Sequence, residues 1–89
     1  MKVLTAQEFQ ELVDNYEGTL LSADGFEDCC VGITMRFGQH EVLAYSYEAV
    51  ISKIEGDAMS HEEAMEYFEC NVLGVWMGGL TPCFIRCHP

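Results

Sequence analysis

Residues 60–79 read SHEEAMEYFECNVLGVWMGG and predict an amphipathic helix. Ser60 followed by Glu63 has the spacing of a capping box, in which the serine oxygen accepts a first-turn N–H and the glutamate reaches back. The apolar residues recur at steps of three and four and therefore share one face: Ala64, Met65, Phe68, Val72, Val75 and Trp76. We expect this helix to supply much of the core and to end at Gly78-Gly79.

The rest of the surface of this helix is acidic. Its glutamates fall largely outside the apolar stripe, and the segment contains no Lys or Arg: Glu62, Glu63, Glu66 and Glu69. One helix therefore combines an apolar inner face with an acidic outer face.

Working outward, residues 6–16 predict a second amphipathic helix, capped by Thr5 with Glu8 and stopped by Gly18. Its inner face follows the i, i+3, i+4, i+7 rule: Phe9, Leu12, Val13 and Tyr16. Its outer face is again acidic, with Glu8, Glu11 and Asp14.

A third helix is predicted between Ser46, a capping residue, and Gly56, a stop. The same spacing places its apolar residues on one face: Tyr47, Val50, Ile51 and Ile54. Lys53 lies on the outer face and is the one basic residue in the three helices.

The strand predictions are shorter. In residues 29–37, CCVGITMRF, the apolar side chains Val31, Ile33, Met35 and Phe37 alternate with other residues, which favours a half-buried strand; a short helix is the alternative. Residues 38–40 then form a turn, and residues 41–45 form the returning strand. Residues 83–86 predict a closing strand, at a sheet edge because Pro82 precedes it.

The predicted order is α-β-β-α-α-β. Three amphipathic helices need a surface to cover, and a small, mainly antiparallel sheet supplies it. The fold class is therefore α+β. Because 89 residues leave no room for two cores, we expect a single domain spanning residues 1–89.

The charge balance is the unusual feature of the composition. Fifteen Asp and Glu residues against four Lys and Arg give a formal charge of -11. Such a field disfavours direct binding to nucleic acid or to an anionic membrane and favours basic protein partners. Solubility alone is the alternative explanation. The loop at residues 18–28 adds Asp24, Glu27 and Asp28, without the ligand spacing of a calcium loop.

Five cysteines occur, namely Cys29, Cys30, Cys70, Cys83 and Cys87. An odd count, an adjacent pair and the absence of an export signal favour reduced, partly buried thiols in a soluble, cytoplasmic protein. A zinc knuckle could be assembled from Cys83, Cys87 and His88 with the adjacent pair. However, neighbouring side chains on a strand point to opposite faces, so we predict no metal site.

Three segments carry a resemblance: GFEDCCVGITMRFG, EVLAYSYEAVISKI and MSHEEAMEYFECNVLGVWMGGLTPCFI. Their spacing resembles a group of small proteins that recur in phage and bacterial genomes. The recognisable frame is Tyr45 and Tyr47, then Glu62 through Val72, then Thr81, Pro82 and Phe84. The resemblance covers about residues 25–85 and implies a phage-type setting without any catalytic residue.

No nucleophile, phosphate-binding or dinucleotide-binding motif occurs, so we predict a non-enzymatic protein without a cofactor. The leading hypothesis is an acidic binding protein that occupies a basic, nucleic-acid-binding surface of a host or defence protein. An anti-CRISPR-like inhibitor is one version. Its predicted partner-binding residues are Glu62, Glu63, Glu66, Glu69, Asp24, Glu27 and Asp28.

Two alternatives to this hypothesis remain. One is a small homodimeric structural or assembly protein, and the less favoured one is a metal- or thiol-dependent enzyme. Tyr67 and Trp76 are candidate interface anchors. Trp76 lies on the apolar stripe, so core packing is favoured over a partner contact for this residue.

Overall fold

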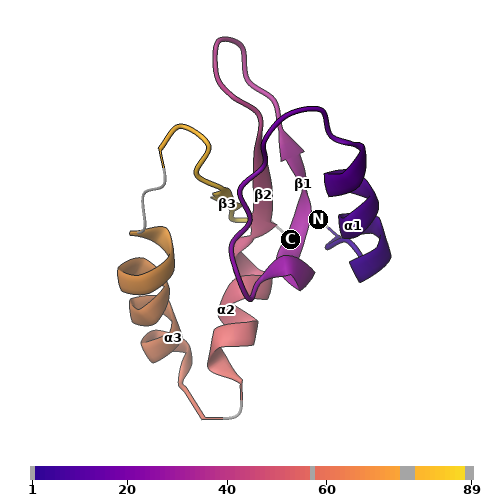
Figure 1. Cartoon of the computed structure of the whole chain (residues 1–89). Coiled ribbons are helices and arrows are strands. Elements are labelled where there is room, and N and C mark those ends of the chain that lie inside the picture. Colours follow the sequence, from indigo (N-terminus) through magenta and orange to yellow (C-terminus); the bar gives the residue numbers. More distant parts are fainter. Residues whose placement is uncertain (1, 57, 75–77, 88–89) are drawn as a thin grey trace.

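The computed structural model describes residues 2–56, 58–74 and 78–87 (Figure 1). Its helices and strands are α1 (Ala6–Asn15), β1 (Cys30–Thr34), β2 (Val42–Ser46), α2 (Tyr47–Glu55), α3 (His61–Phe68) and β3 (Cys83–Ile85). A 3-10 turn, η1 (Glu27–Cys29), precedes β1, and a π-helical turn, η2 (Glu69–Leu73), continues α3. The α+β class and the order α-β-β-α-α-β are confirmed.

The three strands form one mixed sheet in which β2 is central. β1 pairs with β2 antiparallel through a hairpin, whereas β3 pairs with β2 parallel. A parallel pairing needs a long crossover, and α2 with α3 provides it. The sheet is therefore mixed where the sequence predicted a mainly antiparallel one. β3 lies at an edge, as Pro82 predicted.

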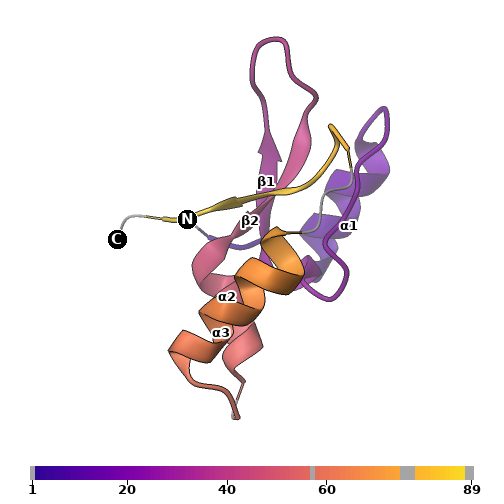
Figure 2. The same cartoon turned by 90° about the vertical axis from the view of Figure 1, so that its left-hand side faces the viewer.

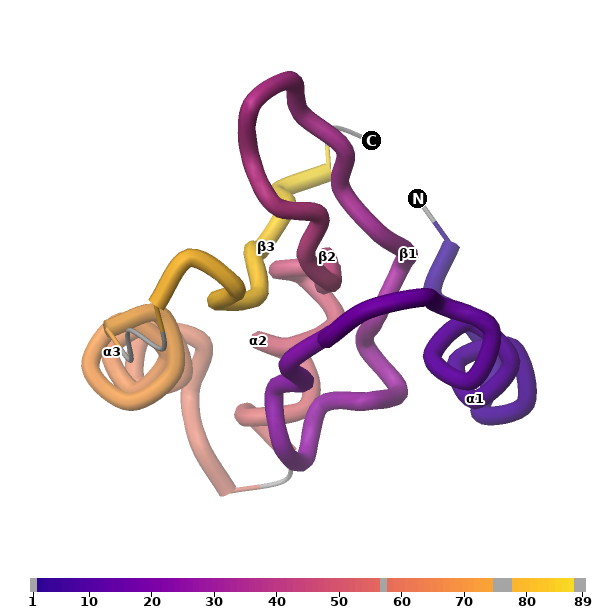
Figure 3. Tube along the Cα trace, turned by 45° about the horizontal axis from the view of Figure 1, so that its top comes forward, coloured from indigo at the N-terminus to yellow at the C-terminus, as the bar shows by residue number. Residues whose placement is uncertain are grey.

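The helices lie on two sides of this sheet. α2 and α3 pack against each other as an antiparallel pair (Figures 1 and 2). α1 lies at the opposite end of the molecule from α3, beside β1 (Figure 3). The Leu4 N–H donates to the Cys30 carbonyl over 2.8 Å and anchors the segment that leads into α1. None of the helices in the described ranges has the length and apolar character that crossing a bilayer requires.

The core joins the centre of the sheet to α2 and α3. Its largest fully buried side chains are Tyr45, Leu43, Val50 and Cys30. Ala64 and Phe68 bury the inner face of α3, as the apolar stripe predicted. The Phe68 ring meets the rings of Tyr47 and Phe84 edge-on, at 5.1 and 5.0 Å between centroids, a favourable geometry for aromatic pairs. No residue of α1 is fully buried.

The predicted helix starts are confirmed in atomic detail. Thr5 Oγ1 accepts the Glu8 N–H over 3.1 Å while Glu8 accepts the Thr5 N–H over 2.9 Å. Ser60 and Glu63 exchange the same pair of bonds, at 3.2 and 3.1 Å. Ser46 Oγ accepts the Ala49 N–H at the start of α2. These side chains satisfy first-turn donors that have no partner within the helix.

The end of the long helix differs from the prediction. Regular α-helix stops at Phe68, η2 carries the chain to Leu73, and Gly74 forms a turn. The described helical residues therefore end at Leu73, before the predicted Gly78-Gly79 stop. Val75 and Trp76, which the sequence assigned to the apolar stripe, lie outside the described residues, so their predicted packing stays a prediction.

The first strand exists but is shorter than residues 29–37. The alternation of apolar residues in the sequence continues beyond the part of the strand that pairs with β2, since the last paired residues are Thr34 and Val42. Met35 and Phe37 lie in the hairpin loop and are exposed, not half-buried. At the N-terminal end of the predicted strand, Cys29 belongs to η1 and not to β1. Cys29 and Cys30 therefore do not lie on opposite faces of a strand, and both are buried. The returning strand is Val42–Ser46, one residue later than predicted.

Candidate partner-binding site

The outer side of α3 and η2 carries a row of carboxylates. Glu62, Glu66 and Glu69 are spaced i, i+4, i+7 and are all exposed; we call these three residues the α3 face. This spacing puts them on one side of the helix. At about 1.5 Å of rise per residue, the row extends over roughly 10 Å. The structure therefore presents a short, linear array of negative charge.

The cations of the chain lie elsewhere. Lys53 Nζ is 2.8 Å from Asp28 Oδ1, and the Arg86 guanidinium lies over the Tyr47 ring at 5.3 Å. Arg36 lies in the β1–β2 hairpin loop, and Lys2 precedes α1. Within the described ranges, no side chain forms an ion pair or hydrogen bond with a carboxylate of the α3 face. Its charge is available to an external partner.

Glu63, which the sequence grouped with these residues, has a structural role. Its carboxylate accepts the Ser60 N–H in the capping box, and this hydrogen bond holds the pKa of Glu63 below its usual value. Changing Glu63 would alter the start of α3 as well as the surface charge. It is therefore the least suitable of the four glutamates for testing a binding role.

The three predicted loop acids do not join the α3 face. Asp28 is held by Lys53, whose hydrogen bond lowers the pKa of Asp28, and together with Glu27 it lines a groove beside α1. Glu27 also accepts the Gly25 N–H over 3.4 Å. Asp24 lines a separate pocket next to η2. The seven residues that the sequence proposed for one site are thus distributed over three places.

Two large apolar side chains of α3 and η2 are exposed. Leu73, which sequence reasoning missed, follows Glu69 by four residues, so it lies on the side of the α3 face, and it has 56% of its surface exposed. Tyr67, which the sequence offered as an interface anchor, has 45% exposed. Leu73 falls outside the apolar stripe of the sequence pattern, which is the signal that could have identified it. Aromatic and aliphatic groups beside charges are typical anchors of protein interfaces.

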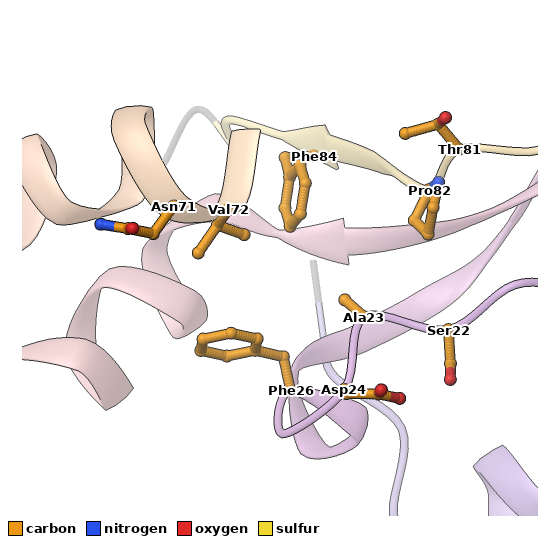
Figure 4. A pocket seen from close by; sticks show the side chains of 9 residues that line it. All are labelled: Ser22, Ala23, Asp24, Phe26, Asn71, Val72, Thr81, Pro82 and Phe84. Carbon is orange, nitrogen blue, oxygen red and sulfur yellow. The ribbon is translucent and has the colours of Figure 1, made fainter. Parts of the chain in front are cut away.

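A pocket of about 220 Å³ lies between η2, β3 and the loop before η1 (Figure 4). Phe26 lies on one side and Phe84 on the other, with Val72 beside them, and Asp24 lies on the loop that closes the pocket. Its remaining lining residues are Ser22, Ala23, Asn71, Thr81 and Pro82. Three separate segments of the sequence form this pocket, so no local sequence motif could have predicted it.

The two buried thiols, Cys29 and Cys30, are poorly suited to nucleophilic chemistry. Burial, followed by the neighbouring Asp28 carboxylate, raises the pKa of Cys29 to about 11, and burial raises the pKa of Cys30. Thiolate, the reactive form, is therefore scarce at neutral pH. Among the residues that the structure describes, no three His, Cys, Asp or Glu side chains are grouped to hold a metal ion. His88 of the considered zinc knuckle lies outside those residues.

Comparison with known proteins gives no relative: no protein-family model, curated protein or solved structure matches this chain. The phage-type frame described above therefore stays a prediction from the sequence.

Proposed function

We propose that this protein is a non-enzymatic, stoichiometric binding protein that occupies a basic, nucleic-acid-binding surface of another protein. The α3 face is the observation that carries the proposal. Glu62, Glu66 and Glu69 form an aligned row of exposed carboxylates, and the four cations of the chain lie elsewhere. A surface built to hold phosphates would recognise such a row by charge.

The net charge of -11 extends this recognition beyond the contact itself. A strongly negative domain is steered toward a cationic surface, which raises the association rate. Once bound, its charge repels negatively charged molecules that compete for the same surface. Leu73 lies on the same side of the helix as the row and supplies apolar area that desolvates the charged contact. The raised pKa values of Cys29 and Cys30 support binding over thiol catalysis as the activity.

The partner class follows from the same chemistry. A protein that normally holds DNA or RNA presents clustered Lys and Arg, and the α3 face would compete for that cluster. With the phage-type resemblance, this points to a host or defence protein, and an anti-CRISPR-like inhibitor is the concrete version.

The test replaces the row and leaves the capping box intact. We compare Glu62→Lys/Glu66→Lys/Glu69→Lys with a matched control on and just after α1, Glu11→Lys/Asp14→Lys/Glu17→Lys, which changes the net charge equally. Candidate partners are basic nucleic-acid-binding effectors, and the readout is displacement of fluorescent DNA or RNA from them. We expect wild type and the control to displace the nucleic acid and the α3 variant to fail.

Salt dependence provides the second readout. Binding through several charge pairs should weaken by at least about tenfold between roughly 50 and 200 mM salt. Binding that is insensitive to salt would show that an uncharged surface is responsible. Equal loss in both triple variants would show that net charge, and not the row, is responsible. Either result would refute the α3 face.

A further inference from the structure

The loop between β1 and β2 carries two apolar side chains that nothing in the described structure covers. Phe37 is fully exposed and Met35 has 78% of its surface exposed. The loop projects beyond the helices in both side views (Figures 1 and 2). We call Met35, Arg36 and Phe37 the hairpin tip.

The charge of this segment is opposite to that of the domain. Residues 29–40 contain no Asp or Glu, although the chain has fifteen, and Arg36 stands between the two apolar residues. A docking site for the hairpin tip should therefore be apolar and aromatic inside and carry a carboxylate at its rim.

The pocket between Phe26 and Phe84 has these properties. An apolar cavity of about 150 Å³ accommodates a benzene molecule, so a pocket of about 220 Å³ has room for one phenyl ring. Asp24 is exposed and lies on the loop at its edge (Figure 4). Size, aromatic lining and charge all match the hairpin tip.

We propose that the hairpin tip of one copy docks into this pocket of a second copy. The Phe37 ring enters between Phe26 and Phe84, and the Arg36 guanidinium pairs with the Asp24 carboxylate. One chain therefore carries both the hairpin tip and the pocket. Their opposite charges, Arg36 and Asp24, favour a second copy of this chain as the occupant of the pocket.

This contact is independent of the proposed function and responds to salt in the opposite way. Two copies with a charge of -11 repel each other, and salt screens that repulsion within about 10 Å. The apolar part of the contact is not weakened by salt. Self-association should therefore stay equal or strengthen as NaCl rises, whereas binding of the α3 face to a basic partner weakens.

The tip and the pocket are separate surfaces, so each half can be removed alone. Phe37→Ser removes the ring, and Val72→Phe fills the pocket from η2 with a new ring, since the Val72 side chain points into the pocket (Figure 4). Sedimentation equilibrium is measured over a concentration series reaching about 1 mM. We expect wild type to self-associate and each variant to raise the dissociation constant by at least about 30-fold, the effect of losing one interface anchor.

Mixing the two variants is the decisive measurement. Phe37→Ser keeps an intact pocket and Val72→Phe keeps an intact tip, so a mixture should form a 1:1 heterodimer at concentrations where each variant alone is monomeric. A monomeric wild type at every concentration, or a mixture that stays monomeric, overturns the proposal. A contact between two tips would leave the pocket variant self-associating and Phe37→Ser monomeric, and this result also overturns it.

A charge exchange tests the same contact without touching the rings. Asp24→Arg and Arg36→Asp should each weaken self-association, and their mixture should restore it. Asp14→Arg, an exposed position on α1, is the control and should retain wild-type association. Equal weakening by Asp14→Arg and Asp24→Arg overturns the pairing, and circular dichroism checks that each variant is folded.

Discussion

The hydroxyl of Tyr45 connects the buried core to the loop that forms the pocket. Tyr45 is fully buried, and its oxygen accepts the Ala23 N–H over 2.9 Å, one residue before Asp24. Tyr45→Phe keeps the ring and removes only this acceptor. A part-buried donor left without a partner costs about 1–3 kcal/mol, so we expect the free energy of unfolding to fall by roughly 1–2 kcal/mol.

For a domain of this size, each kcal/mol corresponds to a Tm decrease of about 4–8 °C. The assay is urea unfolding followed by far-UV circular dichroism, together with hydrogen exchange of the Ala23 amide, which should accelerate. Tyr67→Phe is the matched control, because the exposed Tyr67 hydroxyl makes no hydrogen bond with a described residue. Equal stability of Tyr45→Phe and Tyr67→Phe, or an unchanged Ala23 exchange rate, would refute this role of the hydroxyl.

The same side chain makes stability depend on alkaline pH. Burial raises the pKa of Tyr45 to about 12 from a usual value of 10.0. The folded protein therefore holds this proton where the unfolded chain begins to lose it, so the contribution is complete below pH 10 and is lost as pH rises toward 12. We expect wild type to lose stability faster than Tyr45→Phe across this interval. Parallel pH profiles of the two proteins would contradict the assignment.

Two further predictions follow from the helix caps and the thiols. Ser60→Ala removes the oxygen that accepts the Glu63 N–H and should lower the free energy of unfolding by about 1 kcal/mol in urea, whereas Ser52→Ala, at an exposed position inside α2, should not; equal effects would show that the cap is unimportant. Iodoacetamide should modify the exposed Cys70 under native conditions and reach the buried Cys29 and Cys30 only after unfolding, as peptide mass spectrometry would show; early modification of Cys29 would contradict its burial.

The sequence predicted the elements whose signals are local. Capping boxes at Thr5 and Ser60 involve residues three positions apart, and the apolar stripe of α3 is a repeat within one helix. Such patterns are complete within a few turns, so the chain alone specifies them. The inner face of α3, represented by Ala64 and Phe68, was predicted for this reason.

The features that the sequence did not predict depend on distant partners. Alternation through Phe37 suggested a longer strand, but pairing stops at Thr34 because the strand needs a partner as well as a pattern. The parallel placement of β3 depends on how α2 and α3 return the chain. The pocket needs Phe26, Val72 and Phe84, which only the folded chain brings together.

The position of Glu69 bears most directly on whether the acidic surface serves binding or solubility. Like charges at i, i+3 and i, i+4 destabilise a helix by about 0.2–0.5 kcal/mol per pair, and Glu66 has such neighbours in Glu62 and Glu69. The repulsion at Glu62 is offset by the positive end of the helix dipole, which favours carboxylates in the first turn. Glu69 has no such compensation, since it stands where α3 passes into η2, toward the end at which a cation is favoured. Solubility requires only net charge and would be served equally at positions that cost the helix nothing. The unfavourable placement of Glu69 therefore supports a binding role for the aligned glutamates of the α3 face. Glu69 is the residue whose replacement best separates an effect on binding from an effect on stability.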